Sequence, residues 1–178
     1  MKAEIEIACF TLESAVLAAQ SGANRIEFCS GFEVGGTTPN IKATKNLLSK
    51  TNAPVYVMIR PRGGNFNYTE TEFQTMKRSI YLFKEMNVQG FVFGILNKNN
   101  TVDNDRNKEL VTLCQPFPCT FHRAFDEVLD TRKALEDIIS CGFKTILTSG
   151  TKVNVVEGVA VLKSIIAQAK NRIIIMPG

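Results

Sequence analysis

The feature that most constrains the fold is a regular alternation of short apolar runs with amphipathic segments. Seven apolar runs begin at intervals of about 20 to 35 residues, a spacing that suits βαβ units. We expect strands at residues 5–9, 25–29, 55–60, 90–96, 119–122, 145–148 and 172–176. Between them, apolar residues recur at helical spacing. Strands that alternate with helices in this way predict a parallel sheet built from right-handed units.

Capping signals mark several of the expected helices. The segment TETE at 69–72 is a capping-box sequence ahead of a helix that extends to about residue 86. Thr38 and Pro39 suit the N-cap and the first position of an earlier helix. Gly22 suits the C-terminal end of the first helix. The helices are therefore expected to begin soon after the strands, as in compact α/β folds.

Two α/β architectures are compatible with this alternation. No G-x-G-x-x-G motif follows the first expected strand, and the near-equal units carry no sign of a reversal in strand order. Both observations favour a TIM (β/α)8-type barrel over an open doubly wound sheet. Such barrels have eight strands and typically about 250 residues, whereas this chain has 178 residues. We expect a single TIM-barrel domain over residues 1–178 that lacks its C-terminal end.

Composition and charge restrict the class of partner. Lysine and arginine number 21 against 17 acidic residues, and they are scattered, which argues against a nucleic acid. No apolar stretch approaches the ~18 residues that span a bilayer, and the first residues do not resemble a signal peptide. We therefore expect a cytoplasmic protein with no membrane partner. The five cysteines follow no tight spacing pattern and are expected to be free thiols.

Four charged or titratable side chains are expected to face the barrel interior. Side chains alternate along a strand, and this alternation turns Glu6, Glu27, Arg60 and His122 inward on four different strands. Charges inside a core are costly unless they are paired or used. One interpretation is a structural network in which Arg60 neutralises both glutamates. The other is a catalytic site in which a carboxylate and the imidazole act as general acid and base.

Glycine-rich segments follow several of the expected strands. Their backbone N–H groups, together with nearby arginines, are typical of sites that bind an anion. The candidate anion-binding residues are Arg62, Gly63, Gly64, Ser149 and Gly150. Glycine in such turns often serves only to allow a positive φ, so a structural role stays open. If the loops are functional, the expected ligand is a small anion.

Two cysteines end the first two expected strands. Cys9 and Cys29 would then lie on neighbouring strands about 4.8 Å apart. Two adjacent thiolates suit a soft ion such as Cu(I), whereas a buried cysteine often acts only as a small hydrophobic residue. Alternation counted from Glu6 places Cys9 on the helix side and Cys29 on the inner side, so a shared site requires a local twist or bulge. With one histidine and no C-x2-C pair, zinc is not expected.

Five segments of the chain resemble the signature segments of the CutC copper homeostasis family. They are IEIACF, GANRIEFCSGFEVGGTTPN, VMIRPRGGNFNY, TFHRAFD and ILTSG, in that order. The resemblance runs from about residue 4 to the end of the chain. It implies a cytosolic TIM barrel that takes part in copper homeostasis and forms oligomers. It also implies Cu(I) binding by the cysteines that end the first two strands, which here are Cys9 and Cys29.

Three functions remain open at this point. The first, which the family resemblance favours, is a copper homeostasis protein that binds Cu(I). The second is a TIM-barrel enzyme of unknown reaction that acts on a small anionic metabolite with glutamate and histidine as acid and base. The third is a barrel that serves protein partners and whose polar interior is structural. The resemblance also leads us to expect a homo-oligomer, and it leaves open whether the protein is an enzyme.

Overall fold

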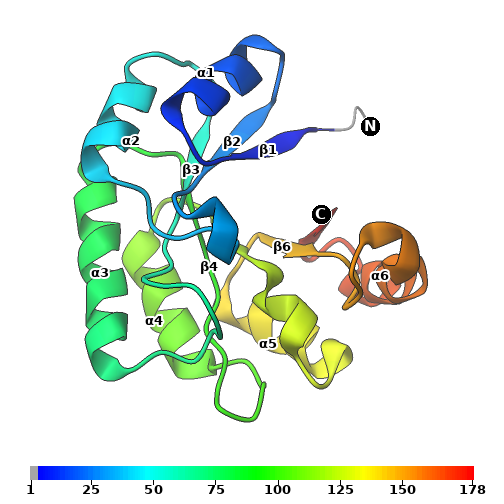
Figure 1. The fold of residues 1–178 in the computed structure, drawn as a ribbon. Coiled ribbons are helices and arrows are strands. Elements are labelled where there is room, and N and C mark those ends of the chain that lie inside the picture. The colour runs from blue at the N-terminus through cyan, green and yellow to red at the C-terminus, as the bar shows by residue number, and fades with distance from the viewer. Residues whose placement is uncertain (1–3) are drawn as a thin grey trace. The chain divides into compact units, whose positions relative to one another are not determined.

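The structure is a computed structural model that describes residues 4–178, so the first three residues of the predicted domain lie outside the described residues. Strands and helices alternate along the chain (Figure 1). The strands are β1 (Glu6–Cys9), β2 (Arg25–Phe28), β3 (Val55–Met58), β4 (Gly90–Phe93), β5 (Cys119–Phe121), β6 (Thr145–Thr148) and β7 (Ile174–Pro177). The helices are α1 (Leu12–Gln20), α2 (Ile41–Leu48), α3 (Glu70–Lys84), α4 (Asn104–Cys114), α5 (Thr131–Cys141) and α6 (Val155–Ala169). Two 3-10 helices, η1 (Phe32–Val34) and η2 (Arg123–Glu127), follow β2 and β5.

The chain divides into two compact units. The first comprises Met1–Asn65 and Glu70–Val92, and the second comprises Phe66–Thr69 and Phe93–Gly178. In the first unit β1 pairs with β2, β2 with β3 and β3 with β4, all in parallel. In the second unit β5 pairs with β6 and β6 with β7, again in parallel. Strand order follows chain order, which confirms the predicted barrel-type α/β fold.

Several strands are shorter than predicted at their carboxyl ends. Strand β2 ends one residue before Cys29, and β3 ends two residues before Arg60. Strand β5 ends at Phe121, and His122 instead forms the N-cap of η2. The apolar pattern continues past the ends of these strands, because the residues that follow stay buried. Of the candidate polar residues, Glu6 and Glu27 lie within β1 and β2, whereas Arg60 and His122 follow β3 and β5.

Helix boundaries also differ in one respect from the prediction. The predicted N-cap at Thr38 is wrong, because Asn40 caps α2 by accepting hydrogen bonds from the N–H groups of Lys42 and Ala43. The Thr38 hydroxyl instead accepts a hydrogen bond from the Arg60 N–H at 2.9 Å. The longest helices have 15 residues, and none in residues 4–178 is both long and apolar enough to cross a membrane.

Each unit has its own apolar core between strands and helices. In the first unit, Ile26, Val57 and Phe91 on the strands and Ile80 and Phe83 on α3 are fully buried. In the second unit, the ring of Phe143 packs against the rings of Phe93 and Phe121 with centroid distances of 5.1 and 5.2 Å. Burying side chains of this size stabilises the fold by about 1.5–3 kcal/mol each. These cores hold the strand ends, and hence the polar residues, in fixed positions.

Candidate functional site

The two cysteines of the first unit lie together at the carboxyl ends of β1 and β2. The N–H of Cys29 donates to the carbonyl oxygen of Cys9 at 2.9 Å, one step beyond the last paired residue of β2. Both are free thiols, and each residue is only 1% exposed. Burial raises the pKa of Cys29, and the nearby carboxylate of Glu27 and the thiol of Cys9 add to the rise. The backbones of the two cysteines are thus paired, whereas the Cys9 thiol donates to the carbonyl oxygen of Ile7 at 3.6 Å.

Cys29 lies beyond the last residue of β2, so strand alternation does not by itself determine where its side chain points. Its thiol donates to Oε1 of Glu27 at 3.4 Å, and it packs in a buried cluster with Met58 and Val92. Burial raises the pKa of Cys9 as well, and a hydrogen bond with Ser14 at the start of α1 opposes this rise. The environment of the pair is apolar, with one carboxylate beside it.

The two glutamates of the predicted site interact with each other and with Arg25. Glu27 is 4% exposed, and burial raises its pKa to about 7, with a further contribution from the charge of Glu6. Burial also raises the pKa of Glu6, whereas its ion pair with Arg25 opposes the rise. Arg25 is the residue directly opposite Glu6 in the β1–β2 ladder. The arginine that pairs with Glu6 is thus a cross-strand neighbour and not the predicted Arg60.

Arg60 holds two loops together. The residue is 5% exposed. Its guanidinium donates hydrogen bonds to the carbonyl oxygens of Val34 at 2.7 Å, Gly36 at 2.8 Å and Gly64 at 2.7 Å. The first two carbonyls belong to the loop after β2, and the third belongs to the loop after β3. Sequence reasoning did not foresee these contacts, since carbonyl oxygens leave no mark on a sequence.

The predicted anion-binding residues that follow β3 already have partners in the fold. Arg62 pairs with Glu72 of α3 at 2.6 Å and also donates to backbone carbonyls of its own loop. A Cβ on Gly63 would lie 2.6 Å from Cβ of Val34, so only glycine fits at this contact. Gly64 has a φ of +79° and accepts the hydrogen bond from Arg60. These contacts explain the glycines without a ligand, and their role in anion binding stays a prediction.

In the second unit, His122 has a defined orientation. Its residue is 3% exposed, its ring lies 4.7 Å from the ring of Phe66, and its Nδ1 accepts a hydrogen bond from the N–H of Ala124 at 3.3 Å. A nitrogen that accepts carries no proton, so the neutral imidazole has its proton on Nε2. A Cβ at Gly94 would lie 3.0 Å from Nδ1, so this glycine allows the close approach. The ring is therefore arranged to donate a hydrogen bond through Nε2.

The loop after β6 is organised around Asp126. Its carboxylate accepts hydrogen bonds from Nε of Arg123 at 2.8 Å, from the hydroxyl of Thr148, from the N–H and hydroxyl of Ser149 at 3.2 Å each, and from the N–H of Thr151 at 2.9 Å. Burial acts to raise the pKa of Asp126, but the hydrogen bonds to Thr148, Arg123 and the two backbone N–H groups outweigh it and lower the pKa. Sequence reasoning missed Asp126 as a residue of this loop, since it lies 22 residues before Thr148.

This carboxylate bears directly on the anion site predicted at Ser149 and Gly150. The N–H of Ser149 donates to Asp126, and the N–H of Gly150 donates to the hydroxyl of Thr148 at 2.9 Å. The loop has the donor arrangement of an anion-binding turn, and a side chain of the protein itself supplies the anion. An external anion at this loop would have to compete with Asp126.

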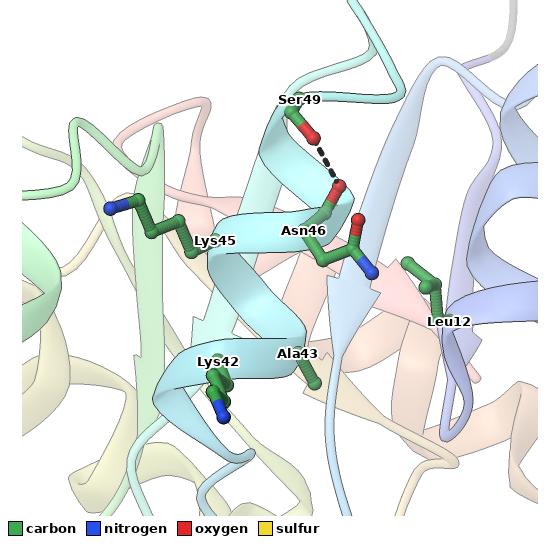
Figure 2. A pocket seen from close by; sticks show the side chains of 6 residues that line it. All are labelled: Leu12, Lys42, Ala43, Lys45, Asn46 and Ser49. Carbon is green, nitrogen blue, oxygen red and sulfur yellow. Dashed lines mark hydrogen bonds between the residues drawn. The ribbon is translucent and has the colours of Figure 1, made fainter.

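A surface pocket of the first unit lies away from these residues. It has a volume of about 560 Å³ and is formed by the first residue of α1 and one face of α2 (Figure 2). The lining side chains are Leu12, Lys42, Ala43, Lys45, Asn46 and Ser49. Figure 2 shows Lys45 extending from α2 on the side opposite to Leu12. None of the predicted site residues lines this pocket.

Within residues 4–178, no group of three or more histidine, cysteine, aspartate and glutamate side chains is placed to hold a metal ion. A site at Cys9 and Cys29 would therefore draw two thiolates from these residue types. Two-thiolate coordination suits a soft monovalent ion better than the divalent metals that prefer four or more ligands.

Comparison with known proteins identifies the family. The model of the CutC family matches residues 3–178. The human and mouse proteins named copper homeostasis protein cutC homolog are 44% and 45% identical to this chain over 174 residues, which are 98% of the chain and 64% of each relative. The crystal structure of the putative copper homeostasis protein CutC from Streptococcus agalactiae is 32% identical and superposes with a TM-score of 0.92, covering 98% of this chain and 86% of that one. The chain spans about two thirds of the length of its human and mouse relatives, and it belongs to the CutC family.

Proposed function

We propose that the chain binds Cu(I) through the thiolates of Cys9 and Cys29 and serves copper homeostasis. The observation that carries this proposal is the direct backbone pairing of the two cysteines at the ends of β1 and β2, with both thiols buried. Membership of the CutC family, whose curated relatives are named copper homeostasis proteins, supports it. The family resemblance is also the basis for proposing a cytoplasmic homo-oligomer.

The chemistry of the donors suits Cu(I). Thiolates and thioethers are soft ligands, and Met58 packs in the same buried cluster as Cys29. Burial in an apolar environment keeps water and oxidants away from a bound monovalent ion. Because burial raises the pKa of both thiols, loading the ion must release protons. The affinity for Cu(I) is therefore expected to increase as the pH rises.

Replacement of either cysteine is expected to abolish tight Cu(I) binding. Cys9→Ser and Cys29→Ser each remove one of two thiolates, so the affinity should fall by more than the roughly 10- to 100-fold that loss of an outer-shell partner costs. The measurement is an anaerobic titration of the reduced protein against a coloured Cu(I) chelator, with a stoichiometry near one ion per chain for the unmodified protein.

The matched control is Cys114→Ser. Cys114 is a fully buried free thiol of α4 in the second unit, so its loss tests for unspecific binding by buried thiols. It should leave the stoichiometry and the affinity unchanged. Undiminished Cu(I) binding after Cys29→Ser would contradict the proposal.

The orientation of His122 supports a second candidate function, an enzyme that acts on a small anionic metabolite. In this proposal His122 of the second unit donates a proton or hydrogen bond through Nε2. In the first unit, Glu27 or Glu6 stays the predicted base, with Arg60 and Arg62 as the predicted positive charges. A pKa of about 7 for Glu27 suits a residue that exchanges protons near neutral pH. The buried, single-tautomer imidazole beside Phe66 is the observation in its favour.

A thermal-shift screen of phosphorylated and carboxylated metabolites tests this second function. A true ligand at 100 times its Kd should stabilise the folded protein by about 2.7 kcal/mol and raise the Tm accordingly. This increase in Tm on addition of the ligand should disappear in His122→Gln, which removes the imidazole. If no metabolite of either class raises the Tm, or if His122→Gln responds as the unmodified protein does, the enzyme hypothesis fails.

A further inference from the structure

The loop of residues 30–37, which follows β2, is closed on itself by backbone hydrogen bonds. Ser30 and Thr37 form an antiparallel bridge, in which each N–H donates to the other carbonyl at 2.9 and 2.7 Å. Inside the bridge, the N–H of Gly36 donates to the carbonyl of Gly31 at 3.0 Å. Both glycines have positive φ values, +65° for Gly31 and +96° for Gly36, which residues with a side chain rarely adopt. The 30–37 loop is therefore a compact flap whose ends are joined by its own backbone hydrogen bonds.

This flap lies against Cys29 directly and against Phe10, which packs on the same buried cluster as Cys29. A Cβ on Gly36 would lie 3.5 Å from Sγ of Cys29, so the backbone of the flap packs directly on that thiol. At the other point the ring of Phe32 contacts the ring of Phe10, the residue after Cys9, with centroids 5.1 Å apart in an edge-to-face arrangement. Phe32 is nevertheless 74% exposed. The flap thus covers the Cys29 thiol with a segment whose outer side faces solvent.

Arg60 binds the flap through hydrogen bonds to backbone carbonyl oxygens of the 30–37 loop. Two of its three carbonyl partners, Val34 and Gly36, belong to the 30–37 loop, and the third, Gly64, belongs to the loop after β3. Hydrogen bonds from a charged donor contribute more than neutral ones, and the planar guanidinium can reach several acceptors at once. Gly36 therefore connects Arg60, through its carbonyl oxygen, with the Cys29 thiol that its backbone covers.

We propose that Arg60 is a positioning residue that holds the 30–37 loop closed over Cys29 and so sets the rate at which external reagents reach this thiol. Each cysteine is 1% exposed, so neither a metal carrier nor an alkylating reagent can reach the sulfur without a local opening. Opening of the flap breaks few contacts compared with unfolding of the strands. The ligand served by this access step rests on the proposed Cu(I) function, but the step itself does not require copper.

Site-resolved alkylation of the native, metal-free protein tests the proposal. Each variant is exposed to N-ethylmaleimide for increasing times, and mass spectrometry measures the rate of modification at each cysteine. Arg60→Lys retains the positive charge but cannot hold three carbonyls with one planar group. It is expected to speed modification of Cys29 by about tenfold or more, because charged hydrogen bonds that keep the flap closed are lost. Cys114, fully buried in the second unit, should react at an unchanged rate.

Two further variants keep the test decisive. Arg106→Lys is the matched control, since Arg106 donates to the carbonyl of Tyr68 at 2.7 Å in the second unit, and it should not affect Cys29. Phe32→Ala removes the exposed ring that rests on Phe10, which packs on the Cys29 cluster, and should speed modification of Cys29 without disturbing a buried charge.

An unchanged rate at Cys29 in Arg60→Lys overturns the proposal. Equal acceleration at Cys29 and Cys114 also overturns it, because that pattern reports a general loss of stability. Since no copper is present, failure of Cu(I) binding and failure of the flap mechanism give separate results.

Discussion

Asp126→Asn is expected to lower the free energy of unfolding by about 3 kcal/mol at neutral pH. The carboxylate accepts hydrogen bonds from five donors, among them the N–H groups of Ser149 and Thr151. An asparagine keeps one acceptor oxygen but turns an NH2 group toward the backbone N–H of either Ser149 or Thr151, so that a donor faces a donor. The charge that favours Arg123 is lost as well.

Denaturant unfolding of Asp126→Asn at several pH values measures this effect. Because the folded protein lowers the pKa of Asp126, its stabilisation is present above the ordinary pKa of 3.8 and is lost as the pH falls through the lower, folded-state value. The difference in the free energy of unfolding between Asp126→Asn and the unmodified protein should therefore become smaller at acidic pH.

The control is Asp137→Asn, the same chemical change at the surface pair with Lys133, where the expected loss is at most about 1 kcal/mol. If Asp126→Asn loses no more stability than Asp137→Asn, Asp126 does not organise the loop.

Glu27→Gln is expected to stabilise the protein at alkaline pH. Glu27 is 4% exposed, and burial raises its pKa from 4.5 to about 7, so the ionised form is disfavoured inside the fold. A rise of this size corresponds to roughly 3 kcal/mol of lost stability once the carboxylate is fully ionised. Glutamine has nearly the same shape, carries no charge, and can still accept the hydrogen bond from Cys29.

The sign of this effect depends on pH. Between pH 4.5 and about 7 the folded protein keeps a proton that the unfolded chain has released, so the contribution of Glu27 to stability decreases as the pH rises through this interval. Glu27→Gln should therefore match the unmodified protein near pH 4.5 and exceed it by up to about 3 kcal/mol at pH 8, as measured by denaturant unfolding.

A surface carboxylate provides the comparison for Glu27. Glu136 pairs with Arg172, and the hydrogen bonds to Arg172 and Gln168 lower its pKa to about 2, the opposite direction. Glu136→Gln should bring no gain in stability at pH 8. If Glu27→Gln is less stable than the unmodified protein at pH 8, the ionised carboxylate has a favourable partner in the fold and the assigned effect of burial is wrong.

The order and type of the strands and helices could be predicted from the sequence because the signals are local. Apolar runs with β-branched residues, such as that at β3, and the glycine that ends α5 act within a few residues of chain. The strand ends were harder to predict. Cys29, Arg60 and His122 follow buried residues without a break in the apolar pattern, so the sequence does not mark the residue at which each strand ends.

The partners of the polar residues could not be predicted in the same way. Alternation along the strands indicated which charged residues are buried, and Glu27, Arg60 and His122 are indeed buried. It did not indicate that Arg25 would pair with Glu6, because that pairing depends on the register between β1 and β2. It also did not indicate that Asp126 would occupy the loop predicted to bind an external anion.

The sequence by itself determined the α/β barrel-type fold, the family, and the position of Cys9 and Cys29 at neighbouring strand ends. These properties follow from local periodicity and from segments that can be read in order along the chain. Tertiary structure alone decided that Arg60 binds the carbonyl oxygens of two loops and that the 30–37 loop covers the Cys29 thiol. The physical reason is that backbone carbonyl and N–H groups are the same in every residue, so which of them meet a given side chain depends on how the chain is folded.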